Sequence, residues 1–207
     1  MTVASLSRTY AAIAALGTLG ALTIWSWINP ADRLTWWLEA LPALIAIVLI
    51  ASYWRRFPLT GILLSLVGIH CAILLIGAHY TYAEVPLGFW MQEWFGFTRN
   101  NYDKIGHFAQ GFVPAIAARE FLIRTSPLQA GKWLFAIVTL SVLGISAAYE
   151  LIEWLAALTS GAAAEAFLGT QGDIWDTQSD MAIALLGAVA AQLMLARIHD
   201  RQLRALV

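Results

Sequence analysis

The sequence predicts an all-α membrane protein, a polytopic bundle of six transmembrane helices with both termini in the cytoplasm. Hydrophobic residues make up 60% of the chain and charged residues 12%, whereas soluble domains carry about half and about a quarter. Apolar runs of roughly 17–25 residues, the length that crosses a bilayer, recur along the chain. No stretch is polar enough for a soluble domain, so residues 1–207 are expected to form a single integral membrane domain.

The first three spans are expected at about 9–28, 36–54 and 60–80. The breaks between them read "NP" at 29–30 and "RRFP" at 55–58. Proline marks such breaks because it has no backbone N–H to donate and disfavours the helical conformation of the residue before it.

The next connection is rich in aromatic residues and poor in charge, and reads "VPLGFWMQEWFGF" at 85–97. One interpretation is a short helix that lies in the outer membrane interface, where Trp and Tyr are enriched. The other is a lid over a site beneath it. The sequence leaves both open.

The last three spans are expected at about 103–124, 132–158 and 176–197, with a break at Ser126-Pro127. Counting charges gives the direction of all six. Basic residues dominate the N-terminus, the second and fourth connections and the C-terminal tail, and they are Arg8, Arg55, Arg56, Arg119, Arg124, Lys132, Arg197, Arg201 and Arg204. Lys and Arg collect on the cytoplasmic side, so both termini are expected there.

Polar and ionisable residues gather near the outer ends of the last three spans. At about 3.6 residues per turn, neighbours in each span fall on one face of its helix. They are Asp103, Lys104, His107 and Gln110 in the fourth span, Glu150 and Glu153 in the fifth, and Asp173, Asp176 and Asp180 in the sixth. We expect these three helices to pack together and bring the side chains to one depth, where His79 is a further candidate.

Ordinary structural roles explain part of this group. Asp173, Asp176 and Asp103 lie where an acid caps a helix and meets its N-terminal dipole. Capping does not explain Glu150, Glu153, Asp180 or His107, which lie inside their spans. A charge within a bilayer costs at least about 2.5–3.5 kcal/mol, so such residues usually face a cavity, a partner or a substrate path.

Crowded carboxylates raise one another's pKa or bind a cation. The expected metal ligands are Glu150, Asp176, Asp180 and His107, and the expected acid or base is His107 or Glu153. A set rich in carboxylates with one imidazole suits Mg, Mn, Ca or Zn and does not choose among them.

Three segments resemble the signature blocks of the YjdF-type bacterial inner-membrane proteins. They are "YDKIGHFAQGFVPAIAARE" (102–120), "YELIEW" (149–154) and "QGDIWDTQSDM" (171–181). The resemblance extends over nearly the whole chain and implies a multi-pass protein of the bacterial inner membrane, without implying a reaction.

A second, weaker likeness covers residues 103–190 and is to the VanZ-like membrane proteins, which are linked to glycopeptide-antibiotic resistance. Their pattern usually has Gln and Asn where this chain has Glu153 and Asp180.

Three functions remain open from the sequence. The first is a metal-dependent enzyme that acts on a lipid or lipid-linked substrate. The second is a non-catalytic membrane component whose polar cluster holds helices together. The third is an ion-coupled transporter, although the inner halves of the spans offer no matching polar path. The expected partners are the lipid bilayer and such a substrate, with no nucleic acid.

Overall fold

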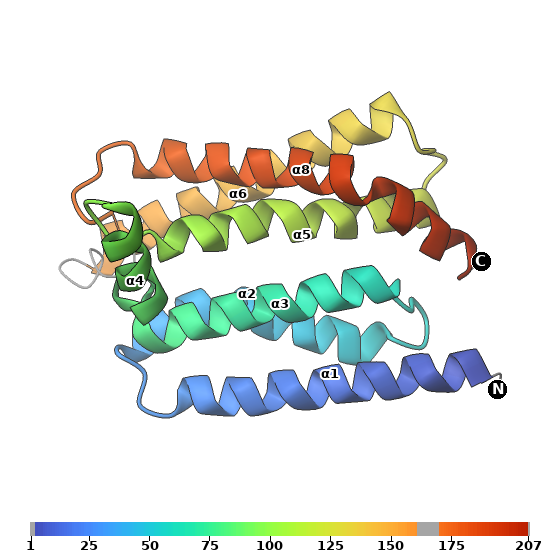
Figure 1. Ribbon diagram of the computed structural model, residues 1–207, viewed down its shortest axis with the longest axis horizontal. Helices are drawn as coiled ribbons and strands as arrows, with labels where there is room; N and C mark the ends of the chain where they lie inside the picture. Colours follow the sequence, from blue (N-terminus) through green and yellow to red (C-terminus); the bar gives the residue numbers. More distant parts are fainter. Residues whose placement is uncertain (1–2, 161–169, 207) are drawn as a thin grey trace. The chain divides into compact units, whose positions relative to one another are not determined.

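The structure, a computed structural model, describes residues 3–160 and 170–206, and every regular element in these ranges is helical (Figure 1). The chain divides into two compact units, Met1–Thr81 and Tyr82–Val207. Each unit is described by itself below. Whether the chain forms one integral domain stays a prediction.

The first unit contains α1 (Val3–Trp27), α2 (Arg33–Tyr53) and α3 (Gly61–Tyr80). Asp32 caps α2 by accepting a hydrogen bond from the Thr35 amide at 2.7 Å, and Thr60 caps α3 through the Leu63 amide at 3.4 Å. These caps satisfy backbone donors that a helix start leaves without partners. The expected spans 36–54 and 60–80 are therefore confirmed as helices to within three residues at each end.

The core of the first unit combines small and bulky apolar residues. It consists of Leu19, Trp36, Ala40, Ala43, Cys71, Leu75 and Ala78. Small residues let helices approach closely, as is usual where lipid removes the hydrophobic drive between them. The single cysteine is buried here, in agreement with its position in an apolar run.

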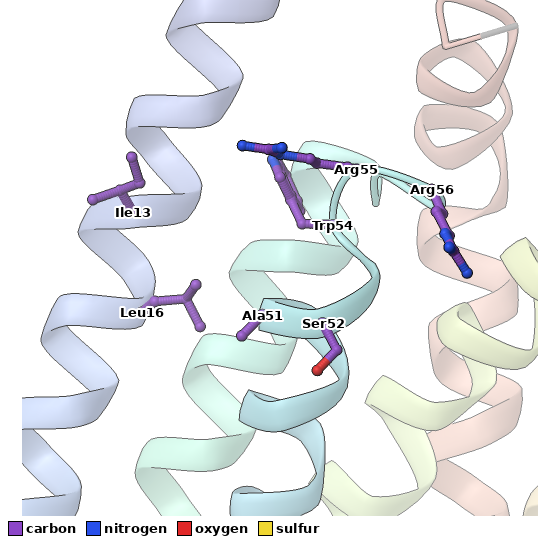
Figure 2. Close-up of a pocket in the computed structure, with 7 residues that line it drawn as sticks. All are labelled: Ile13, Leu16, Ala51, Ser52, Trp54, Arg55 and Arg56. Atoms are coloured by element: carbon purple, nitrogen blue, oxygen red, sulfur yellow. The ribbon is translucent and has the colours of Figure 1, made fainter.

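The two ends of the first unit differ. At one end Trp25 stacks on His79 with ring centroids 4.4 Å apart, and the His79 Nδ1 atom lies 3.2 Å from the Ser26 carbonyl. The contacts described for His79 thus lie within this unit. At the other end a cavity of about 340 Å³ lies beside the turn that follows α2 (Figure 2).

The second unit contains η1 (Tyr82–Glu84), α4 (Pro86–Phe95), α5 (Tyr102–Thr125), α6 (Lys132–Ser160) and α8 (Asp176–Arg204). The aromatic segment 85–97 is confirmed as a short helix, α4, which ends at Gly96 with a φ of +68°. Glycine suits this left-handed position because it has no Cβ to clash. Its place in the membrane interface stays a prediction.

Helix α5 packs along α8 and against α6 (Figure 1). The contact with α8 depends on two glycines. A Cβ at Gly111 would overlap the Ala184 carbonyl oxygen, and one at Gly187 would overlap the Phe108 carbonyl oxygen. The backbones of α5 and α8 are therefore in direct contact, which fixes the rotation of each helix about its axis.

Within the described residues, four helical segments are long and apolar enough to cross a bilayer by length and composition. They are Arg33–Tyr53, Gly61–Tyr80, Lys132–Leu158 and Asp176–Arg204. The segment Ile13–Trp27 of α1 is also apolar but shorter. Helix α5 is long enough but carries charged residues near both ends, which include Asp103 and Arg119.

The last helix extends beyond the expected end of the sixth span at about 197. The basic residues after position 197 were interpreted as a tail, but α8 continues to Arg204. His199 and Asp200 both contact Arg119 of α5, and these contacts stabilise the last turns of α8.

Candidate functional site

The start of α5 is tied to the loop before α8. The backbone N–H of Asn100 donates to the Gln171 Oε1 atom at 3.1 Å, and the Gln171 amide donates back to the Asn100 carbonyl at 2.7 Å. The Asn100 side chain accepts from the Tyr102 amide and donates to the Val85 carbonyl. These bonds hold the 96–101 segment, the start of α5 and the loop before α8 in one arrangement.

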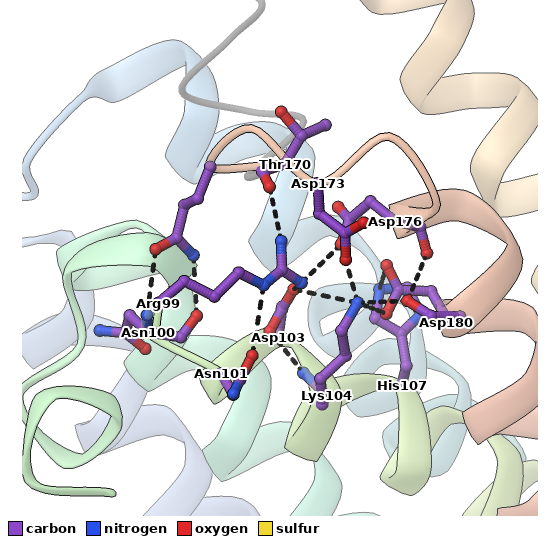
Figure 3. A network of polar contacts seen from close by, with 12 residues as sticks. Arg99, Asn100, Asn101, Asp103, Lys104, His107, Thr170, Asp173, Asp176 and Asp180 are labelled. Carbon is purple, nitrogen blue, oxygen red and sulfur yellow. Dashed lines mark hydrogen bonds and ion pairs between the residues drawn. The ribbon is translucent and has the colours of Figure 1, made fainter. Parts of the chain in front are cut away.

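An ion network joins α5 to α8 at this end (Figure 3). It consists of Arg99, Asp103, Lys104, Asp176 and Asp180, and is called the Arg99–Lys104 network below. The Arg99 Nη2 atom lies 2.9 Å from Asp103 and 2.6 Å from Asp176. The Lys104 ammonium lies 2.7 Å from both Asp176 and Asp180 and also donates to Ser179.

Arg99 lies before α5, in the connecting segment. Burial by itself lowers the pKa of Arg99, but the neighbouring carboxylates of Asp103 and Asp176 raise it by more, so the net shift is upward. The guanidinium is therefore a permanent cation and donates to two acids from different helices.

His107 lies one turn into α5, between two carboxylates from different helices. Its Nδ1 atom is 3.9 Å from Glu150 Oε1 on α6, and its Nε2 atom is 3.7 Å from Asp180 Oδ2 on α8. The side chains of His107, Glu150 and Asp180 are only 11%, 6% and 4% exposed. The predicted convergence of the three helices on His107 is thus present in the structure, at distances too long for direct hydrogen bonds.

Buried polar atoms without a hydrogen-bond partner gather at this point. They include His107 Nδ1, Glu150 Oε1 and, one turn earlier on α6, Ser146 Oγ. Leaving a buried donor or acceptor without a partner costs about 1–3 kcal/mol each.

In the part of the chain that the structure describes, two groups of ligand atoms are close enough to bind a metal ion, each with all its atoms within 4.8 Å of one another. One is His107, Glu150 and Asp180, and the other is Asp103, Asp176 and Asp180. All three acids of the second group contact Arg99 or Lys104, whereas the first group meets this network only through Asp180 and includes the unpartnered atoms.

The remaining predicted site residues lie around these groups. Gln110 follows His107 on α5 and is half-buried, and Glu153 follows Glu150 on α6 and is half-buried. Among the described residues neither group of metal-ligand atoms includes Glu153. The role of Glu153 as an acid or base stays a prediction.

The capping interpretation does not hold for the three acids, because neither α5 nor α8 has a side-chain hydrogen bond at its N-cap. Asp173 accepts from the Trp175 amide at 2.9 Å, in the turn before α8. Asp176 pairs with Arg99 and Lys104 instead, and the start of α8 has no side-chain cap. Asp103 accepts from the Lys104 amide but pairs chiefly with Arg99, so neither is mainly a cap.

Sequence reasoning missed a second buried network at the other end of α5 and α8. His199 is fully buried between Arg119 and Glu120, at 2.9 Å and 3.0 Å. Arginine has only donors, so the His199 Nδ1 atom accepts from Arg119 and its Nε2–H donates to Glu120. Arg124 and Asp200 complete this Glu120–His199 network. The sequence signal for it is the i, i+4 pair of Glu120 and Arg124, of which the charge count uses only the arginine.

An apolar cavity of about 400 Å³ lies beside the Arg99–Lys104 network. Its lining combines α4, α5 and α8 and consists of Met91, Phe97, Asn101, Lys104, Ile105, Phe108 and Ile183. Lys104 contributes to both the cavity and the network, so the two are adjacent.

The chain matches the family Predicted membrane protein (DUF2238) over residues 11–201. It is also similar to "Inner membrane protein YjdF" of Escherichia coli (strain K12), with 52% identity over 187 residues that cover 90% of each chain. No solved structure matches the chain. The likeness to VanZ-like proteins is not shown by these comparisons.

The expected YjdF-type resemblance is confirmed, and with it the assignment to the inner membrane as a multi-pass protein. The match covers α5, α6 and α8, and therefore the helices that carry the site. The chain belongs to the predicted membrane protein family DUF2238.

Proposed function

We propose that the second unit holds a divalent cation between His107, Glu150 and Asp180, and that the protein is a metal-dependent enzyme acting on a lipid or lipid-linked substrate. The observation that carries the proposal is the pair of unpartnered buried atoms, His107 Nδ1 and Glu150 Oε1, which face each other.

Charge balance supports the cation. Four buried acids, Asp103, Glu150, Asp176 and Asp180, surround two cations, Arg99 and Lys104. If all four acids are ionised, the site has an excess of two negative charges, which one divalent ion neutralises. At an effective dielectric of about 20, two like charges 4 Å apart repel by roughly 4 kcal/mol, so the excess is costly without it.

The donor set favours zinc or manganese among the four candidate metals. One imidazole nitrogen and two carboxylate oxygens suit these ions better than Mg or Ca, which prefer oxygen alone. Two atoms that bind one Zn²⁺ at about 2.0–2.1 Å lie about 3.4 Å apart in a tetrahedral site. With one ligand atom from each residue, the three atoms of His107, Glu150 and Asp180 lie within 4.8 Å of one another, so they would have to move closer together to bind one ion.

Each residue would have a separate role in the proposed reaction. A bound metal supplies a Lewis acid that polarises a substrate oxygen or activates water. His107 would bind the metal through one nitrogen. The acid or base that accepts or donates a proton would then be Glu153, which lies outside the ligand group. Lys104 holds Asp180 in place through its Oδ1 atom, and it presents a positive charge to the adjacent cavity.

The cavity supports a lipidic substrate. Its lining is mainly apolar, with Phe97, Phe108 and Ile183 among its residues, and Lys104 supplies a cation. This combination suits a molecule with a hydrocarbon chain and an anionic group. The proposal includes a topology of six spans with both termini in the cytoplasm. In this topology the site would lie at the outer leaflet.

A non-catalytic role has its own supporting observation. Arg99 and Lys104 bridge three acids from two helices, and Arg99 also donates to the Thr170 carbonyl. A network of this kind holds helices and loops together whether or not a metal binds. The test below separates the two roles.

Thermal melts in detergent, with chelator and then with each metal, test the proposal. A ligand at 100 times its Kd stabilises a protein by about 2.7 kcal/mol, so Zn²⁺ or Mn²⁺ should raise the melting temperature after chelator treatment. Glu150→Gln should abolish this response, whereas Glu93→Gln, an exposed acid on α4, should keep it. If no metal raises the melting temperature of the wild type, the non-catalytic structural role is supported and the proposal of a metal-dependent enzyme is wrong.

A further inference from the structure

The cavity in the first unit lies between α1 and the end of α2 and has both apolar and basic lining. Its volume is about 340 Å³, and its lining consists of Ile13, Leu16, Ala51, Ser52, Trp54, Arg55 and Arg56. In Figure 2, Arg55 extends from the turn towards α1 above Trp54, whereas Arg56 points to the other side of the same turn. The apolar wall comes from α1 and the last turn of α2.

The turn that carries the two arginines is held at both ends. The Trp54 amide donates to the Ile50 carbonyl at 3.0 Å, and the amides of Arg56 and Phe57 donate to the Tyr53 carbonyl at 2.9 Å and 2.8 Å. Four residues later, Thr60 caps α3. A ligand would therefore meet guanidinium groups on an ordered backbone, which lowers the entropy lost on binding.

Neither arginine has an acid to neutralise it in this unit. The acids of the first unit are Asp32, which caps the start of α2, and Glu39, in its second turn. At a rise of about 1.5 Å per residue, Glu39 lies roughly 24 Å along the helix from Arg55. Arg55 and Arg56 are exposed, and this end of the unit is positively charged.

We propose that this cavity binds the headgroup of an anionic glycerophospholipid, with one acyl chain along the apolar wall formed by Ile13, Leu16 and Ala51. The phosphate would accept hydrogen bonds from Arg55, since a guanidinium matches two phosphate oxygens at once. Basic pockets between membrane helices recognise anionic headgroups in this way. The inference is independent of the metal site, and in the six-span topology it assigns the lipid to the cytoplasmic leaflet.

Native mass spectrometry of the full-length protein in detergent tests the inference. Phosphatidylglycerol, which is anionic, is titrated against phosphatidylcholine, which is zwitterionic and carries the same chains. Phosphatidylglycerol should bind the wild type more tightly. The double variant Arg55→Gln/Arg56→Gln should weaken it about 30-fold, since each basic side chain near an anionic surface contributes on the order of a factor of five.

A matched control removes the same charge elsewhere. Arg201→Gln/Arg204→Gln changes two exposed arginines on α8 and should leave the binding unchanged. Ala51→Phe keeps both arginines but fills the exposed wall of the cavity, and it should also weaken binding. Equal binding of the two lipids, equal loss in the α8 variant, or displacement by inorganic phosphate alone at matched concentration would each overturn the proposal.

Discussion

At the scale of single residues, two neighbours on α5 have opposite environments. The Lys104 ammonium has three close partners, Asp176, Ser179 and Asp180, while the His107 imidazole lies beyond hydrogen-bond distance from both of its carboxylates. Lys104 therefore stabilises the positions of Asp176 and Asp180, and the His107 imidazole remains available to bind another group. Asp180 belongs to both environments, because one of its oxygens faces Lys104 and the other faces His107.

Lys104→Met should destabilise the protein by about 3–5 kcal/mol, because it leaves the buried carboxylate of Asp180 without its lysine partner and removes one of two cations from Asp176. Combining it with Asp180→Asn should cost less than the sum of the single changes, by about 0.5–3 kcal/mol of coupling. Unfolding by denaturant in detergent measures both. Lys132→Met changes an exposed lysine at the start of α6 and is the control, with a small expected effect on stability. If Lys104→Met had an effect as small as that of the control, the stabilising role of the Arg99–Lys104 network would be contradicted.

At the scale of helices, the site depends on the close contact of α5 with α8. Gly111 and Gly187 allow it, and Ala184, Ala188 and Ala191 are fully buried in the same part of α8. Beyond these small residues, the Arg99–Lys104 network and the Glu120–His199 network pair the helices at their two ends. The two helices are thus held at three levels along their length.

Gly111→Ala should destabilise the second unit and reduce any metal response, because its Cβ would overlap the backbone of α8. Gly144→Ala on α6 is the matched control, since nothing lies within 4 Å of the added Cβ. The control should be neutral or stabilising by up to about 1 kcal/mol, from the better helix propensity of alanine. Melting both variants with and without metal checks this, and a neutral Gly111→Ala would mean that the helices are further apart.

His199→Phe should lower stability by several kcal/mol, since it leaves Arg119 and Glu120 buried without their shared partner. Metal affinity should remain as in the wild type, because this network lies at the opposite end of α5. Arg197→Gln, an exposed residue two positions earlier, should change neither property. A normal melt for His199→Phe would contradict the structural role of the Glu120–His199 network.

At the scale of the whole molecule, the placement of basic residues predicts the direction of the chain across the membrane. Reporter fusions after Arg56, after Lys132 and at the C-terminus should report a cytoplasmic position, and a fusion after Phe97 should report an external one. The activities of paired reporters that work only inside or only outside measure this. An external C-terminus would overturn the six-span topology and the outer-leaflet position of the site.

Much of the fold could be predicted from the sequence because proline breaks and caps mark helix ends locally. The first half shows this at Asn29-Pro30 and Pro58, which separate helices at the expected places. The end of α8 could not be predicted in this way. Its last basic residues resemble a tail until Arg119 and Glu120 are known to lie opposite His199 and Asp200.

Part of the site was predictable from the spacing of residues along each helix. Helical spacing placed His107, Glu150 and Asp180 on faces that converge once the spans alternate in direction. Arg99 could be expected near the acids, but its partners were not predictable, because they depend on the position of a loop that brings Thr170 and Asp176, more than 70 residues away, next to it. Helical periodicity carries no information about such contacts.

The amount of metal bound per chain tests the central claim most directly. Protein purified in detergent without chelator, and dialysed against metal-free buffer, is measured by elemental analysis. The account predicts about one zinc or manganese ion per wild-type chain, none in Glu150→Gln, and an unchanged amount in Glu153→Gln, whose carboxylate lies outside the ligand group. A wild-type chain that binds no metal, even after incubation with each ion, would contradict it.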